Sequence, residues 1–289
     1  MGNGDQPLLG VGACATLACL WESTAAKPGN VYRGADFEDL TYADFVTSAA
    51  VIGPIVDQAP QRGVGATILA GSLATQAAVG TNTNLGMLLL IAPLAVVPDG
   101  RPLAEGVAGV LSGLNRDDCE DVYAAIRLIQ PGGLGEAPEA DVRTAPLPDL
   151  TLLDAMGLAA DRDLVARQYA DGFAEVFWTA ERLEDAAADQ PLGEAVVHAY
   201  LKLLAAHPDS LIARKCGSAV AEEAAARAAA VLERQSHDRE AYGEALADFD
   251  FWLRADGHRR NPGTSADVIA AALFVLLRER RLNWPIRFY

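Results

Sequence analysis

The stretch AEEAAARAAA (residues 221–230) decides the fold class, because seven of its ten residues are alanine. Alanine has the highest intrinsic helix propensity, and its small side chain lets neighbouring helices pack closely. Across the 289 residues, aromatic side chains make up only 7%, whereas hydrophobic residues reach 51%, which is enough for a substantial core. We therefore predict an all-α protein, built as a single multi-helix bundle.

Apolar periodicity and capping signals place helices along most of the chain. Helix starts are expected at Thr41, Asn115 and Thr151, where Asp44 and Asp154 occupy capping-box positions after the two threonines. The expected helices cover residues 8–21, 41 onward, 65–79, 84–93, 103–112, 115–130, 151 onward, about 163–187, 191–207, 218–234, 238–255 and 266–280.

The polar loops are scattered through the sequence and separated by helices, so one bundle can gather them at one end. We predict one domain over residues 1–289, and the best alternative boundary lies near residue 140. Glycines and prolines make 131–150 irregular, as an active-site loop, a lid or a plain connector. An extended tail, 281–289, is a candidate contact with a second subunit in a homodimer.

The net charge of −16 argues against a nucleic-acid partner, because such proteins neutralise phosphates with a basic face. The four cysteines show no C-x-x-C spacing, which favours a reducing cytoplasm over a secreted disulfide framework. The apolar stretches lack a signal-peptide pattern and are too short to span a bilayer. We therefore expect a cytoplasmic protein without a membrane partner.

Two loops interrupt the helices with residues suited to binding phosphate: AKPGNV (26–31) and GTNTNLG (80–86). Glycine exposes the backbone, while a cation, amides and hydroxyls supply ligands at or near helix ends. The alternatives are a helix-stopping turn with an exposed lysine in the first loop, and simple N-capping in the second. The predicted substrate-binding residues of these loops are Lys27, Gly29, Asn30, Arg33, Gly80, Asn82, Thr83 and Asn84.

Carboxylates near the first loop are the candidate catalysts. Glu22 lies five residues before Lys27, so one helix end and its loop can present both charges to one substrate. Asp36 and Asp39 are predicted to act as a base or to hold Mg²⁺. The alternative for Glu22 is a surface glutamate paired with lysine. The alternative for the two aspartates is a pair of solvated acids before a helix.

Five segments occur in an order that resembles a known family. They are ACLWEST (18–24), AKPGNVYRGADFEDL (26–40), GTNTNLGM (80–87), HPDSLIARKCG (207–217) and NPGTSADVIAA (261–271). The order is similar to that of the triphosphoribosyl-dephospho-CoA synthases. The resemblance implies a mainly helical transferase that moves the triphosphoribosyl part of ATP to dephospho-CoA and releases adenine. Such chemistry needs a base for the acceptor hydroxyl and a proton for the leaving adenine.

The resemblance also suggests roles for the later motifs. Asp209 is a candidate Mg²⁺ ligand, together with Asp36 and Asp39, and Arg214 with Lys215 would contact the triphosphate of ATP. A capped turn is the alternative for that motif. In the last motif, Asp267 is interpreted as a residue that stabilises the first turn of a helix.

The chain departs from the family pattern at three places. Leu85 follows the Asn-Thr segment where better-known members have histidine and lysine, and 32–35 replaces an aspartate, asparagine and histidine. The segment 214–217 replaces an Arg-Gly-Gly pattern. Two alternatives therefore stay open. One is a related nucleotide-dependent enzyme with another acceptor in a different cofactor pathway, and the other is a non-catalytic helical nucleotide-binding or scaffold protein.

Overall fold

The computed structural model describes residues 7–132, 142, 149–235 and 239–289. These residues form fifteen helices and one short strand, so the all-α prediction is confirmed. The elements are α1 (Val11–Thr24), α2 (Tyr42–Val56), α3 (Ala59–Arg62), α4 (Val64–Val79), α5 (Leu85–Val96), α6 (Leu103–Ser112), α7 (Arg116–Ile129), α8 (Leu152–Ala159), α9 (Leu164–Asp171), α10 (Ala174–Asp189), α11 (Leu192–Ala206), α12 (Ser210–Cys216), α13 (Ser218–Gln235), α14 (Arg239–Arg254), β1 (Ala255–His258) and α15 (Gly263–Arg278).

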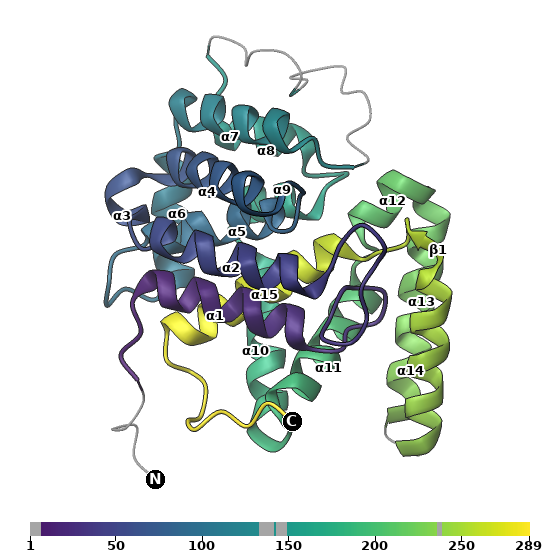
Figure 1. Ribbon diagram of the computed structural model, residues 1–289. Helices are drawn as coiled ribbons and strands as arrows, with labels where there is room; N and C mark the ends of the chain where they lie inside the picture. The colour runs from purple at the N-terminus through teal and green to yellow at the C-terminus, as the bar shows by residue number, and fades with distance from the viewer. Residues whose placement is uncertain (1–6, 133–141, 143–148, 236–238) are drawn as a thin grey trace.

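Helix α15 is the centre of the molecule and runs between the other helices (Figure 1). It packs against α1 and α5 on the N-terminal side and against α10 and α11 on the C-terminal side. Its side chains are buried almost all the way round, from Thr264 to Leu277. A helix that is apolar on every face is stable only inside a protein, which explains its central place.

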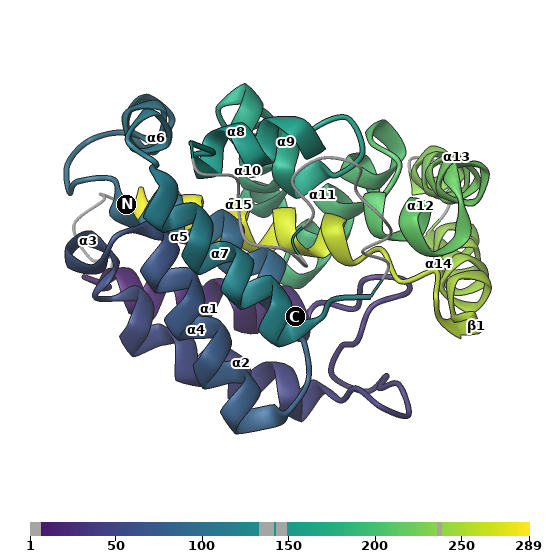
Figure 2. The ribbon, with the colours of Figure 1, turned by 90° about the horizontal axis from the view of Figure 1, so that it is seen from above.

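Helices α1, α2, α4 and α7 pack against one another in that order and form the N-terminal half. On the other side α10, α11, α13 and α14 pack in sequence, and the α13–α14 pair lies at the far edge of the molecule (Figure 2). Alanine-rich α13 buries Ala221, Ala224, Ala225 and Ala228 against its neighbours. The small side chains that predicted the fold class are therefore the ones that let these helices approach closely.

Helix starts with a local sequence signal lie where the sequence predicts them. Thr41 and Asp44 form a capping box before α2, and Thr151 and Asp154 form another before α8. Asn115 caps α7 by accepting hydrogen bonds from the amides of two residues in its first turn. These contacts join residues two or three positions apart, so tertiary structure is not needed to specify them.

The structure differs from the sequence-based expectation over residues 163–187. The expected single helix is two helices, α9 and α10, because Gly172 and Phe173 both adopt a left-handed conformation, with φ of 70° and 68°. The Phe173 side chain is fully buried and its ring lies 5.7 Å from that of Tyr169. Burial of this ring in the core accompanies a backbone conformation that a non-glycine residue rarely adopts.

The C-terminal tail packs on its own chain. The rings of Trp284 and Trp21 lie 6.1 Å apart, and the amides of Leu192 and Gly193 donate to the carbonyls of Arg287 and Phe288. Most of the expected loop or lid at 131–150 lies outside the described residues. No helix among the described residues is both long and apolar enough to cross a membrane.

Candidate functional site

A cavity of about 680 Å³ lies between the two halves of the molecule. Its wall includes the end of α1, the loop between α4 and α5, the two helices α7 and α8, helix α12 and the start of α15. One half of the lining is polar and the other half is apolar. The cavity therefore suits a ligand that combines charged and weakly polar parts.

Nine of the predicted site residues line this cavity. They come from segments that are far apart in the sequence, as expected when a helical bundle gathers its loops. These residues are Glu22, Asn30, Asp39, Gly80, Asn82, Thr83, Asn84, Arg214 and Lys215. The other predicted residues, Lys27, Gly29, Arg33, Asp36 and Asp209, are not part of its lining.

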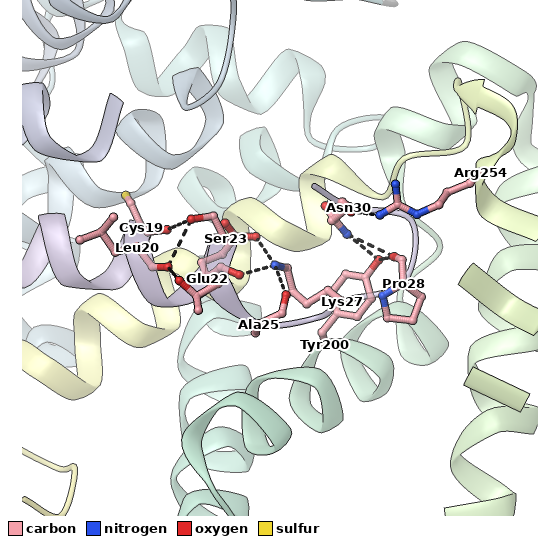
Figure 3. Close-up of polar contacts among 11 residues, drawn as sticks. Cys19, Leu20, Glu22, Ser23, Ala25, Lys27, Pro28, Asn30, Tyr200 and Arg254 are labelled. Atoms are coloured by element: carbon pink, nitrogen blue, oxygen red, sulfur yellow. Dashed lines mark hydrogen bonds and ion pairs between the residues drawn. The ribbon is translucent and has the colours of Figure 1, made fainter. Parts of the chain in front are cut away.

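The Glu22 carboxylate is the most unusual group in the wall. Glu22 is only 2% exposed, and its Oε1 lies 2.8 Å from the Nζ of Lys27 (Figure 3). Its Oε2 is buried without a hydrogen-bond partner. Burial raises the pKa of Glu22, while the charge and hydrogen bond of Lys27 lower it. A buried carboxylate oxygen without a partner is costly, so a ligand that donates a proton or hydrogen bond fits here.

Lys27 is fully buried, which differs from the predicted phosphate contact. Its ammonium group binds the carboxylate and the backbone carbonyl of Glu22, and it also donates to the Ala25 carbonyl at 3.5 Å (Figure 3). The ammonium is thereby held beneath Glu22, with no surface left for a substrate. The sequence shows that Glu22 and Lys27 are close, but it does not show that both are inside the protein.

Gly29 and Asn30 shape the first loop by packing against distant helices. Gly29 has φ of 76°, and its amide donates to Asp250 of α14 at 2.7 Å. The Asn30 amide group donates to the hydroxyl of Tyr200 at 2.9 Å and also to the Pro28 carbonyl (Figure 3). Gly29 is therefore a structural residue, while Asn30, 5% exposed, is anchored at the edge of the cavity.

The second loop lies at the N-terminus of α5, as expected. Asn82 accepts a hydrogen bond from the Leu85 amide at 3.2 Å, and Asn84 accepts one from the Thr75 hydroxyl at 3.1 Å. Asn84 is only 4% exposed, and its Nδ2 is buried without a hydrogen-bond partner. N-capping explains Asn82 but leaves this Asn84 donor free for a ligand.

The three predicted Mg²⁺ ligands do not come together. Asp209 is fully buried, and its two oxygens accept hydrogen bonds from the amides of Leu211, Ile212 and Ser265 and from the Ser265 hydroxyl. Asp36 is exposed and accepts from the Tyr42 amide, whereas Asp39 contacts His258 at 3.1 Å. Among the described residues no group of three or more His, Cys, Asp or Glu side chains could hold a metal. The predicted ligand set does not fit a protein-held magnesium ion.

Two cations stand at the polar end of the cavity. Arg214 forms an ion pair with Asp163, and Lys215, the next residue on α12, is half-buried. Burial lowers the pKa of Lys215 below its ordinary value. Arg33 is exposed and lies outside the lining, so this cation of the first loop does not face the cavity. Arg162, between α8 and α9, lines the cavity together with the two cations of α12.

Asp267 lines the cavity, although the sequence was interpreted as giving it a role only in helix stability. An ideal Cβ placed on Gly86 would lie 2.0 Å from its Oδ2, so the carboxylate is seated directly against the start of α5. Burial raises the pKa of Asp267 well above its usual range, and Glu22, Asp209 and Asp163 raise it further. No local signal in the sequence marks this contact, because Gly86 and Asp267 lie 181 positions apart.

The apolar half of the cavity is supplied largely by helices outside the five motifs. Its side chains come mainly from α7 and α8, with contributions from α5 and α9. They include Met87, Leu89, Val122, Ile126, Ile129, Leu152, Ala155, Met156, Ala159 and Val165. Leu128 and Leu158 also line the cavity and are 37% and 45% exposed. A purely phosphate-binding site would have no use for so large an apolar wall.

The sequence was compared with models of known protein families. The model for ATP:dephospho-CoA triphosphoribosyl transferase matches residues 9–286, which is nearly the whole chain. The chain belongs to this family. Its members transfer the triphosphoribosyl group of ATP to dephospho-CoA, so the resemblance in the five motifs is confirmed.

A solved structure supports the same assignment. The chain is similar to a protein from Archaeoglobus fulgidus that is assigned as a triphosphoribosyl-dephospho-CoA synthase, with 27% sequence identity and a TM-score of 0.65. The match covers 80% of this chain and 97% of the other. No curated protein matches the chain significantly. A triphosphoribosyl transferase needs one subsite that binds the anionic triphosphate and another that binds the acceptor. The polar half and the apolar half of the cavity are consistent with that requirement.

Proposed function

We propose that the protein transfers the triphosphoribosyl group of ATP to a ribose hydroxyl of dephospho-CoA in this cavity, with Glu22 as the base. The observation that carries the proposal is the free Oε2 of Glu22, buried in the wall while Lys27 holds Oε1. A carboxylate fixed in this way has one oxygen ready to accept the acceptor proton. The scaffold alternative offers no reason to bury an unpaired oxygen beside a cavity.

The polar end suits the triphosphate and ribose of ATP. Arg214 and Lys215 provide positive charge, while Asn84 has a free donor near the start of α5. Arginine and lysine bind phosphate oxygens through charge-assisted hydrogen bonds. We infer that Mg²⁺ enters with the phosphates of ATP, which supply most of its ligands, because the described residues contain no three-ligand group.

The apolar half suits the acceptor. Dephospho-CoA carries a long, weakly polar pantetheine arm, and the side chains of α7 and α8 offer it a continuous apolar wall. The acceptor hydroxyl would then reach Glu22 from the other end of the same cavity. We also propose a cytoplasmic location, because all four cysteines are free, three of them buried.

The test is an assay of adenine release and of the heavier coenzyme product by mass spectrometry, using ATP and Mg²⁺ with and without dephospho-CoA. Adenine and product that appear only with dephospho-CoA support the proposal. Release with AMP or another nucleotide acceptor, but not with dephospho-CoA, would favour the different-acceptor alternative. Binding of ATP without any release would favour the non-catalytic alternative.

Glu22→Gln removes the base and keeps the size of the side chain. We expect kcat to fall about 10²–10⁴-fold, the usual contribution of a general base. Glu222→Gln, on the exposed side of α13, is the matched control and should keep wild-type activity. Equal activity of Glu22→Gln and wild type would contradict the assignment of Glu22.

A further inference from the structure

The transfer requires an acid as well as a base. The bond between C1′ of the ATP ribose and N9 of adenine breaks, its electron pair stays with N9, and the acceptor oxygen forms a new bond to C1′. The acceptor proton goes to Glu22, and adenine leaves as a neutral base only if another group protonates a ring nitrogen. The acid in this step must face the same cavity as Glu22.

Asp267 has the required position. It lies in the second turn of α15, lines the cavity, and its carboxylate is seated against Gly86 at the start of α5. No hydrogen bond or ion pair joins its side chain to another described residue, so the carboxyl group is free to contact a ligand. Asn84, two residues before Gly86, has its unpaired buried Nδ2 at the same helix start.

The charges around Asp267 and Glu22 are opposite in kind. Asp267 faces Glu22 on α1, Asp163 before α9 and Asp209 before α12. Arg214 lowers the pKa of Asp267, but this arginine is already paired with Asp163. Glu22, in contrast, has Lys27 bound to its Oε1. Burial raises the pKa of both carboxyl groups, but Lys27 opposes that effect at Glu22, whereas neighbouring acids add to it at Asp267. A proton is therefore held more firmly on Asp267 than on Glu22.

We propose that Asp267 is the general acid that protonates adenine as it leaves, while Glu22 accepts the proton of the acceptor hydroxyl. This inference rests on the proposed transferase function. After one turnover Glu22 carries the proton taken from the acceptor and Asp267 is ionised. Exchange of protons with water restores both groups, so the net reaction moves one proton from the acceptor to adenine.

The experiment compares ATP with its N7-methylated analogue, whose 7-methyladenine leaves as a neutral base without receiving a proton. Asp267→Asn should lower kcat with ATP about 10²–10⁴-fold, as for loss of a general acid. With the methylated donor the same variant should lose less than about tenfold relative to wild type. Glu22→Gln should be impaired with both donors, because the acceptor hydroxyl still needs a base.

A second measurement does not depend on the analogue. The wild-type rate with ATP should fall at alkaline pH as Asp267 loses its proton, and Asp267→Asn should lack this alkaline limb. Asp248→Asn, exposed on α14, is the matched control and should behave as wild type in both experiments.

Equal loss with the two donors, or an alkaline limb that persists in Asp267→Asn, would overturn the assignment of Asp267 and leave the proposed function standing. Absence of adenine release from the wild type with ATP and dephospho-CoA would overturn both proposals.

Discussion

Glu22 and Asp267 show how the surroundings of a residue decide its chemistry. Both carboxyl groups line the same cavity, but one is held by a buried lysine and the other is surrounded mainly by acids. The sequence predicted that Glu22 and Lys27 act together, because Lys27 follows Glu22 by only five positions. It could not predict the burial of Lys27 or the position of Asp267, since both depend on helices far away in the chain.

Lys27→Met tests the positioning role of the lysine. The buried carboxylate of Glu22 would lose its partner, and breaking a buried ion pair costs about 3–5 kcal/mol of the free energy of unfolding. Because Lys27 lowers the pKa of Glu22, its removal should also move the acidic limb of the rate profile to higher pH. Urea denaturation and a pH–rate profile measure the two effects.

Lys27→Arg keeps the charge and is the control for Lys27→Met. It should retain more stability than the methionine variant and leave the acidic limb close to its wild-type position. A methionine variant with reduced activity but an unshifted profile would show that Lys27 affects packing alone.

Asp267→Asn should stabilise the protein at neutral and alkaline pH while it lowers activity. The native pKa of Asp267 is raised above the unfolded value, so the native state binds more protons over the pH range between the two values. The contribution of Asp267 to the free energy of unfolding is therefore fully present below the unfolded pKa of about 3.9, and it is lost as pH rises through the native pKa. The asparagine variant cannot ionise, so its advantage should grow from pH 4 to pH 8.

Urea denaturation at several pH values checks this prediction. A constant difference in the free energy of unfolding between Asp267→Asn and wild type would contradict it. The combination of greater stability with lower activity is common for residues that a site keeps in an unfavourable environment.

The site depends on close approach between two helices, because the start of α5 lies against the start of α15. Gly86 provides the space, because any larger side chain would collide with the Asp267 carboxylate. Gly86→Ala should lower the free energy of unfolding by about 1–3 kcal/mol, the usual cost of overpacking, and should also reduce activity. Denaturation curves and the adenine assay measure these changes.

Gly109→Ala is the matched control for Gly86→Ala. Gly109 is exposed on α6, and an added Cβ would meet no atom within 4 Å. Alanine there should be neutral or stabilise the helix by about 0.5–1 kcal/mol. Equal effects at the two glycines would mean that contact with Asp267 does not decide the cost at Gly86.

Asp209 joins α12 to α15 and so connects two of the motifs that are far apart in the sequence. Its Oδ1 accepts from two amides of α12 and its Oδ2 from the amide and hydroxyl of Ser265. Asp209→Ala should cost about 3 kcal/mol or more, because hydrogen bonds to a charged group contribute about 1.5–3 kcal/mol each. Thr151→Ala removes a cap that serves one helix and should cost only about 1 kcal/mol. Similar losses in the two variants would show that the connection to α15 contributes little.

Elements specified by local contacts were predictable, and those specified by packing were not. The caps at Thr41 and Thr151 fix two helix starts from neighbouring residues. The break between α9 and α10 has a local signal only in Gly172, which ends α9 in a left-handed conformation. The left-handed conformation of Phe173 accompanies burial of its ring and could not be predicted from neighbouring residues. Helix α12 is not among the helices expected from the sequence, where a capped turn was only the alternative for its motif, and the helix packs against α13.

At the scale of the whole molecule, the cavity exists only because the two halves meet on α15. Helix α1 supplies Glu22, the start of α5 supplies Asn84, and α7 and α8 supply most of the apolar wall. Helix α12 supplies Arg214 and Lys215, and α15 supplies Asp267. The motifs predicted the polar half because each carries distinctive residue types. The apolar half was invisible in the sequence, since leucine, valine and methionine on α7 and α8 look the same whether they line a cavity or a core.

Ala155→Trp tests the division of the cavity between the two substrates. Ala155 lies on α8 in the apolar half, and an indole there would fill space that we assign to the pantetheine arm. We expect KM for dephospho-CoA to rise at least about tenfold, equivalent to about 1.4 kcal/mol, while Kd for ATP stays within about twofold of wild type. Steady-state kinetics measure the first value and calorimetry with ATP alone measures the second. A large loss of ATP affinity with an unchanged acceptor KM would place adenine, and not the acceptor, against α7 and α8. That outcome would reverse the arrangement of the two substrates, because the cavity has a single apolar wall among the residues described and both cannot occupy it together.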